Sequence, residues 1–155
     1  MKVCVFSTQK YDEQAFGQWA DPAIHWTFFS QKLDLVSVHV AAGADAICVF
    51  VNDQLDAAVL QALKNLGINK IALRCAGFNN VDMAMAKQLN FTVVRVPAYS
   101  PQAVAEHSVG LMLCLNRKFH KAYNRTRDNN FDLNGLLGFY LHRKTVGVIG
   151  TGRIG

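Results

Sequence analysis

Residues 55–75, LDAAVLQALKNLGINKIALRC, combine an amphipathic helical pattern with a short apolar run that follows it directly. The apolar side chains of the helical stripe are Leu55, Val59, Leu60, Leu63 and Leu66. Gly67 follows them as a helix stop, and residues 70–75 then have the length and composition of a buried strand. A helix that leads into such a strand is the unit from which parallel α/β sheets are built.

The same alternation extends over the first part of the chain. Four further apolar runs are strand candidates, at residues 2–7, 24–30, 46–51 and 91–97. Apolar side chains at helical spacing occur between them, at residues 12–20, 34–44 and 82–90. In this chain of 155 residues, the pattern predicts an α/β fold with a five-stranded parallel sheet that is complete by about residue 97.

The segment that follows the sheet has a different character. Ser100 is a candidate N-cap, Pro101 occupies the first helical position, and Gly110 is the only helix breaker before residue 127. This predicts one helix from residue 101 to about 127, which is longer than the usual globular helix of about 11–12 residues. A helix of that length is typical of a connector between domains.

The end of the sequence, TVGVIGTGRIG (residues 145–155), reads as a buried strand at 146–149 and a GxGxxG turn. The turn consists of Gly150, Thr151, Gly152, Arg153, Ile154 and Gly155. By itself the motif is also compatible with an ordinary glycine-rich turn, since neither the following helix nor the later acidic residue is present to confirm a dinucleotide site. We expect the chain to be part of a longer protein.

Composition excludes several functional classes. A hydrophobic fraction of 51% with 17% charged residues is typical of a globular protein, and no apolar run approaches the roughly 18 residues of a membrane span. The start shows no signal-peptide pattern, so we expect a cytoplasmic protein that does not bind membranes. The net charge of +5 comes from scattered Lys and Arg, the densest group resembling the polar face of a helix, so nucleic acid is not an expected partner.

The four cysteines are Cys4, Cys48, Cys75 and Cys114, each among apolar residues. They show neither CxxC nor Cys/His spacing. We therefore expect reduced, structural cysteines and no metal site.

Two loops at the expected carboxyl edge of the sheet could carry chemistry, since ligands of open parallel sheets bind there. In RCAGFNNVD (74–82), the backbone of Cys75, Ala76, Gly77 and Phe78 could converge on a small anion, with Gly77 leaving room for its approach. The same residues could instead form a tight turn, with Asn80 or Asp82 capping the next helix. Arg74 is interpreted as a structural cation.

The second loop, VPAYSP (96–101), places Tyr99 between Pro97 and Pro101, which limit its backbone. The Tyr99 hydroxyl could reach a ligand, or the ring could be half-buried packing.

Three motifs in this order and spacing carry a resemblance: RCAGFNNVD (74–82), VVRVPAYSPQAVAEH (93–107) and KTVGVIGTGRIG (144–155). Over essentially its whole length the chain resembles the D-isomer-specific 2-hydroxyacid dehydrogenases, and most of all their bacterial fermentative branch that forms D-lactate. The resemblance implies a flavodoxin-like substrate domain into which a Rossmann domain is inserted. Residues 1–100 would be the substrate domain, 101–140 the crossing helix and linker, and 141–155 the first strand and glycine turn of the NAD-binding domain.

The resemblance also implies roles for individual residues. The backbone of Cys75, Ala76, Gly77 and Phe78 would bind the substrate carboxylate, Tyr99 would reach the substrate, and Gly150–Gly155 would hold the cofactor pyrophosphate, with Arg153 and Ile154 closest. The arginine, histidine and glutamate that perform the family's chemistry are expected beyond Gly155. None of the five histidines is assigned a catalytic role, and residues 1–155 alone are predicted to be inactive.

The function implied is reduction of pyruvate to D-lactate with NADH by a homo-oligomer, a dimer or a tetramer. The choice of NAD over NADP comes from the resemblance alone. Two alternatives stay open: a different 2-oxo acid such as glyoxylate, hydroxypyruvate or a bulkier keto acid, and a nucleotide-sensing co-repressor of the same fold. Tyr99 beside Pro101 favours the lactate branch.

Overall fold

The computed structural model describes residues 1–19 and 21–155. It divides into two compact units, Met1–Tyr99 and Ser100–Gly155. Ala20, the last residue of the helix expected over 12–20, lies outside the described residues.

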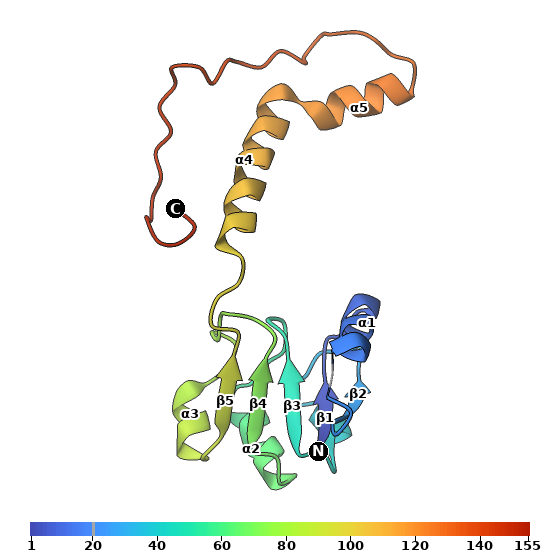
Figure 1. Cartoon of the computed structure of the whole chain (residues 1–155), viewed down its shortest axis with the longest axis vertical. Coiled ribbons are helices and arrows are strands. Elements are labelled where there is room, and N and C mark those ends of the chain that lie inside the picture. Colours follow the sequence, from blue (N-terminus) through green and yellow to red (C-terminus); the bar gives the residue numbers. More distant parts are fainter. Residues whose placement is uncertain (20) are drawn as a thin grey trace. The chain divides into compact units, whose positions relative to one another are not determined.

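The first unit contains a five-stranded parallel sheet in the order β2-β1-β3-β4-β5 (Figure 1). Its strands are β1 (Lys2–Val5), β2 (His25–Phe28), β3 (Ala46–Val49), β4 (Lys70–Leu73) and β5 (Thr92–Arg95). Each lies within one of the five apolar runs, which confirms the predicted sheet. The carboxyl ends of all five parallel strands lie at the same edge of the sheet. The strand order is that of flavodoxin-like folds: β2 is added on one side of β1, and β3, β4 and β5 follow on the other side.

The elements between the strands are α1 (Lys10–Trp19), the 3₁₀ helix η1 (Val38–Ala41), α2 (Ala57–Asn65) and α3 (Met83–Gln88). The leucine-rich stripe forms α2 as predicted. The Asp56 side chain caps its first turn by accepting the Val59 N–H at 3.0 Å, and Gly67 follows its end with a φ of +81°. Asp82, not Asn80, caps α3.

The helix expected over 34–44 was wrong in extent, since only η1 forms there. The Asp34 carboxylate accepts the backbone N–H groups of Val36 and Ser37, both at 3.0 Å. These are N-cap bonds, and the Val38 N–H donates to the Asp34 carbonyl at 3.0 Å, so a helical turn does begin at Asp34. It continues only as η1, and Gly43, with a φ of +79°, follows its end. The N-cap bonds also hold the pKa of Asp34 below its usual value, chiefly through the bond from the Ser37 backbone.

The sheet is covered on both faces. On one face, apolar side chains of β1, β3 and β4 pack against α2, α3 and η1 in the larger core. On the other face, Val5 and Cys48 form part of a smaller core that includes Phe16 of α1. Burial raises the pKa of the Cys48 thiol to about 11, so this cysteine remains a protonated core side chain at neutral pH, as expected for a structural cysteine.

A buried carboxylate joins three segments at the carboxyl edge of the sheet. Asp53, which is 1% exposed, accepts the Ser7 hydroxyl and the Leu33 N–H at 2.7 Å on one oxygen. Its other oxygen accepts the Phe50 N–H at 2.6 Å. Asn80 adds a fourth segment by donating to the Asp53 backbone carbonyl at 2.9 Å. The segments that follow β1, β3 and β4 are therefore all hydrogen-bonded to Asp53.

The second unit contains α4 (Pro101–Arg117) and α5 (Phe119–Arg127) (Figure 1). The prediction of one helix over 101–127 was wrong, because Lys118 has left-handed backbone angles of 53° and 37° that interrupt the helix. The sequence contains no glycine or proline at this point to indicate the break. In this conformation Lys118 Nζ donates to the Gly135 carbonyl at 3.0 Å, which offsets part of the backbone strain.

The linker after α5 is attached to the helices by side chains. Arg125 donates to the carbonyls of Asp132 and Asn134, both at 2.7 Å. The Asn116 side-chain amide donates to the Phe139 carbonyl at 2.8 Å and accepts a hydrogen bond from the Phe139 N–H at 3.0 Å.

Within the described ranges, no helix has both the length and the apolar composition needed to cross a membrane.

Residues 141–155 carry neither helix nor strand, so the strand expected at 146–149 is not formed. Val146, Val148 and Ile149 are exposed, and no described segment pairs with them. A parallel strand gains its hydrogen bonds only from a neighbour, so an apolar run without one does not become a strand. The assignment of this segment to an NAD-binding domain stays a prediction.

Replacing Asp53 by Ala is expected to lower the free energy of unfolding by about 3 kcal/mol, because one buried N–H group, one partly buried N–H group and one hydroxyl lose a charged acceptor. Ser7→Ala is the matched control, since it removes only the hydroxyl bond and is expected to cost about 1 kcal/mol. Urea unfolding followed by circular dichroism measures both. If Asp53→Ala costs no more than Ser7→Ala, Asp53 does not organise this edge.

Candidate functional site

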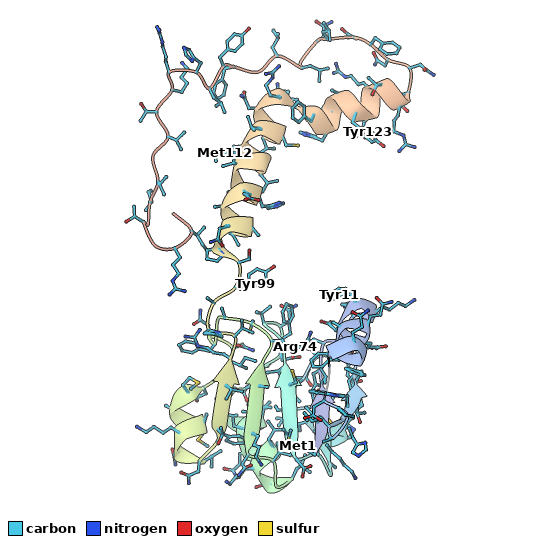
Figure 2. All side chains as sticks on the ribbon, in the orientation of Figure 1. Met1, Tyr11, Arg74, Tyr99, Met112 and Tyr123 are labelled. Carbon is cyan, nitrogen blue, oxygen red and sulfur yellow. The ribbon has the colours of Figure 1, made fainter. Side chains whose placement is uncertain are left out.

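A pocket of about 550 Å³ lies at the carboxyl edge of the sheet in the first unit. Its walls come from α1, from the residues after β3 and β4, and from the segment after β5. The lining residues are Tyr11, Asp12, Phe50, Val51, Arg74, Cys75, Ala76, Gly77 and Tyr99. Figure 2 shows Arg74 at the ends of the strands and Tyr11 on the neighbouring α1. The pocket thus lies where the fold class predicts a ligand.

In the loop after β4, three successive backbone carbonyls each accept a hydrogen bond. The Cys75 carbonyl accepts the Val96 N–H at 3.2 Å, and the Ala76 carbonyl accepts Arg95 Nη1 at 2.7 Å. The Gly77 carbonyl accepts the Cys75 thiol at 3.2 Å. Burial raises the pKa of the Cys75 thiol, against the opposing charge of Arg74, so the thiol keeps its proton and can donate at neutral pH.

The N–H groups of the same loop are free. Among the described residues, none accepts a hydrogen bond from the backbone N–H of Ala76, Gly77 or Phe78. Backbone N–H groups without a partner are the kind of donor that binds an anion, and Ala76 and Gly77 line the pocket whereas Phe78 does not. Gly77 adds space, because a Cβ built there meets nothing within 4 Å. Three of the four predicted loop residues, Ala76, Gly77 and Phe78, thus have N–H groups without a partner among the described residues, and their role toward a substrate stays a prediction.

Arg74 is not available as a free cation for a ligand. Its Nη1 pairs with Asp12 at 2.7 Å, and both side chains are largely buried. Its Nη2 donates to the carbonyls of Phe6 and Ser7 at 2.7 and 3.2 Å, and its guanidinium lies 5.1 Å from the centre of the Phe50 ring. These contacts join the end of β4 to the end of β1 and the first turn of α1. They agree with the interpretation of Arg74 as a structural cation.

Tyr99 lies in the lining of the pocket, with 70% of its surface exposed. Its hydroxyl is accessible in this unit, and its contact with a ligand stays a prediction. Tyr11 and Asp12 of α1 and Phe50 and Val51 after β3 also line the pocket, and the sequence analysis did not identify them. Their position could have been predicted, because β1 and β3 end at the same edge of the sheet as the strands that precede the two candidate loops.

The predicted cofactor residues Gly150–Gly155 belong to the second unit. Gly150 has a φ of +92°, a left-handed value that favours glycine and suits the first glycine of a dinucleotide turn. Residues 150–155 form neither a strand nor a helix N-terminus in this structure, so their role toward a pyrophosphate stays a prediction.

Two of the five histidines have side-chain contacts with nearby groups. His39 Nδ1 lies 2.8 Å from the Val36 carbonyl, and His120 Nδ1 lies 3.9 Å from Cys114 Sγ. In residues 1–19 and 21–155, no group of three or more His, Cys, Asp or Glu side chains is placed to hold a metal ion.

Comparison with known proteins places this geometry in a family. The family described as D-isomer specific 2-hydroxyacid dehydrogenase, catalytic domain, matches residues 3–147. The D-lactate dehydrogenase of Escherichia coli (strain K12) is 52% identical over 156 residues, which cover 100% of this chain and 47% of that protein. The chain therefore spans about half the length of the curated relatives it matches.

Solved structures agree in fold. The apo-structure of D-lactate dehydrogenase from Escherichia coli has a TM-score of 0.91, with 52% identity, 99% of this chain covered and 49% of that chain. A D-lactate dehydrogenase from Aquifex aeolicus, complexed with NAD and lactic acid, has a TM-score of 0.79 at 30% identity and covers 99% of this chain and 45% of that chain. With a family match over nearly all of its length, the chain belongs to the D-isomer-specific 2-hydroxyacid dehydrogenases.

Proposed function

We propose that this chain supplies the substrate-binding domain of an NAD-dependent D-lactate dehydrogenase, which reduces pyruvate to D-lactate with NADH. The observation that carries the proposal is the set of free N–H donors at Ala76, Gly77 and Phe78, in a loop that borders the pocket at the carboxyl edge of the sheet. The names of the relatives from Escherichia coli and Aquifex aeolicus support lactate as the substrate class.

In this proposal the chain binds and orients the substrate. The loop N–H groups receive the carboxylate of pyruvate, and hydrogen bonds to a charged acceptor are among the stronger ones in proteins. Tyr99, which lines the same pocket, adds a hydroxyl. The Asp12–Arg74 ion pair keeps α1 and the loop in place, and neither residue is assigned a proton-transfer role because each side chain is already paired.

The cofactor is proposed to be NAD, held at its pyrophosphate by Gly150, Thr151, Gly152, Arg153, Ile154 and Gly155. The left-handed backbone of Gly150 supports this, as does the relative complexed with NAD. When bound, NADH supplies the hydride for the carbonyl carbon. The arginine, histidine and glutamate that polarise the carbonyl and move the proton are proposed to lie beyond Gly155 in the full-length enzyme.

We propose in addition that the full-length enzyme is a cytoplasmic homo-oligomer, a dimer or a tetramer. Large apolar side chains on α4 are exposed in this unit, among them Val109, Met112 and Leu115. Apolar side chains around more than one stripe of a helix favour contacts beyond a single core. The four cysteines are free thiols, which is typical of a reducing compartment.

The activity is tested by following NADH absorbance with the full-length enzyme and pyruvate, glyoxylate, hydroxypyruvate or a bulkier 2-oxo acid. Pyruvate is expected to have the highest kcat/KM. Residues 1–155 alone are expected to oxidise no NADH above a heat-treated control, since the proton-transfer residues are absent. Preference for another 2-oxo acid would contradict the proposed substrate. Activity of residues 1–155 alone would contradict the proposal that the proton-transfer residues lie beyond Gly155.

Replacing Tyr99 by Phe in the full-length enzyme should remove one hydrogen bond to substrate while the ring stays in place. The expected loss in kcat/KM for pyruvate is roughly ten- to a hundredfold, mainly through a higher KM, with KM for NADH unchanged. Tyr123→Phe, on α5 and outside the pocket, is the matched control. An unaltered KM for pyruvate in Tyr99→Phe would reduce Tyr99 to a packing residue.

A further inference from the structure

We propose that Arg95, at the end of β5, is a positioning residue that orients the Ala76–Gly77 peptide for the substrate carboxylate. The inference rests on the proposed function, because it explains how the loop presents its donors. Arg95 itself does not line the pocket and is not proposed to touch the substrate. Its effect is exerted through the backbone of the loop.

Arg95 holds the loop at two points. Its Nη1 donates to the Ala76 carbonyl at 2.7 Å, a short distance for a charge-assisted hydrogen bond. Its guanidinium carbon also lies 5.4 Å from the centre of the Phe78 ring, within the range of a cation–π contact. The two contacts lie on either side of Gly77, so one side chain bridges the flexible residue of the loop.

A hydrogen bond to the carbonyl of a peptide also determines the direction in which the N–H group of the same peptide points. A trans peptide is planar, and its C=O and N–H point in opposite directions. A partner on the Ala76 carbonyl therefore fixes the direction of the Gly77 N–H. By the same argument, Val96 directs the Ala76 N–H through the Cys75 carbonyl, and the Cys75 thiol directs the Phe78 N–H through the Gly77 carbonyl.

The middle peptide is the one that most needs such a partner. Gly77 has no Cβ to restrict its backbone, and open space surrounds it. Without Arg95, the Ala76 carbonyl has no acceptor bond among the described residues and the peptide plane is free to rotate. The loop would then offer the carboxylate two oriented donors in place of three.

The chemistry of the side chain distinguishes Arg95 from a general positive charge. A planar guanidinium can donate to Ala76 and stack on Phe78 at the same time, which an ammonium group does less well. Arg74, the other arginine at this edge, is directed toward Asp12 and β1. The orientation of the loop thus depends on the neighbouring strand.

The test compares Arg95→Met, Arg95→Gln and Arg95→Lys in the full-length enzyme. Gln keeps a neutral donor that can bond the Ala76 carbonyl, whereas Lys keeps the charge without the planar fork. The matched control is Lys70→Met, which removes one exposed charge at the opposite end of the neighbouring strand β4. Measurements are KM for pyruvate, kcat, KM for NADH and the thermal unfolding midpoint.

We expect Arg95→Met to raise KM for pyruvate about tenfold, with KM for NADH and the unfolding midpoint close to those of the unsubstituted enzyme. Arg95→Gln is expected to recover part of that loss, and Lys70→Met to have no effect. Two results would overturn the proposal: an unchanged KM in Arg95→Met, or full recovery by Lys together with none by Gln, which would make charge alone the cause.

A crystal structure of full-length Arg95→Met separates this proposal from the proposed function. The Ala76–Gly77 peptide plane is expected to be rotated relative to that of the unsubstituted enzyme. If the unsubstituted enzyme does not use pyruvate, the proposed function fails and Arg95 is judged on this plane alone. An unrotated peptide contradicts the positioning role whatever the substrate is.

Discussion

The Asp53 carboxylate lies inside the first unit and accepts hydrogen bonds from segments that are far apart in the sequence: Ser7 after β1, Leu33 before η1 and Phe50 after β3. A buried carboxylate is stable only where donors surround it, so these segments cannot separate without leaving it unpaired. Because the segments after β1 and β3 also form walls of the pocket, one buried residue fixes the framework on which the candidate site is built.

Two arginines at the ends of the neighbouring strands β4 and β5 connect further segments around the pocket. Arg74 follows β4 and joins that strand to α1 through Asp12, while its Nη2 holds the end of β1. Arg95 ends β5 and contacts the loop after β4 on the Ala76 carbonyl. Both arginines therefore contact the backbone around the site, and in the proposed function the loop N–H groups are the donors to the substrate carboxylate. Such a site suits a small carboxylate, since backbone donors do not carry the flexibility of long side chains.

Much of this fold follows from local patterns. The five apolar runs became the five strands, and the stripe that begins at Leu55 became α2, because periodicity and length distinguish helices from strands within a short window. Three predicted elements were wrong: the helix over 34–44, the single helix over 101–127 and the strand at 146–149. After the capped turn at Asp34 only η1 forms, and Gly43 with its left-handed φ follows it. The break at Lys118 coincides with a contact to Gly135 that no local pattern reveals, and the run at 146–149 has no neighbouring strand among the described residues.

The same distinction applies to the site. The loop from Cys75 to Phe78 could be predicted because it follows a strand and contains glycine, and the motif order indicated its family. Asp53 and Arg95 could not be assigned roles, since their significance comes from partners such as Ser7 and Ala76 that only the folded sheet brings near. Pocket residues on α1 were likewise missed, because helical spacing predicts which side chains face the core and not which border a cleft.

The central claim is that oriented N–H groups of the loop after β4 receive the substrate carboxylate. It is tested most directly by a crystal structure of the full-length enzyme with NADH and a non-reacting pyruvate analogue. The account predicts carboxylate oxygens within hydrogen-bond distance of the N–H groups of Gly77 and at least one of Ala76 and Phe78, with the Arg95 bond to Ala76 intact. A carboxylate bound elsewhere, with these N–H groups bonded only to water, would contradict it.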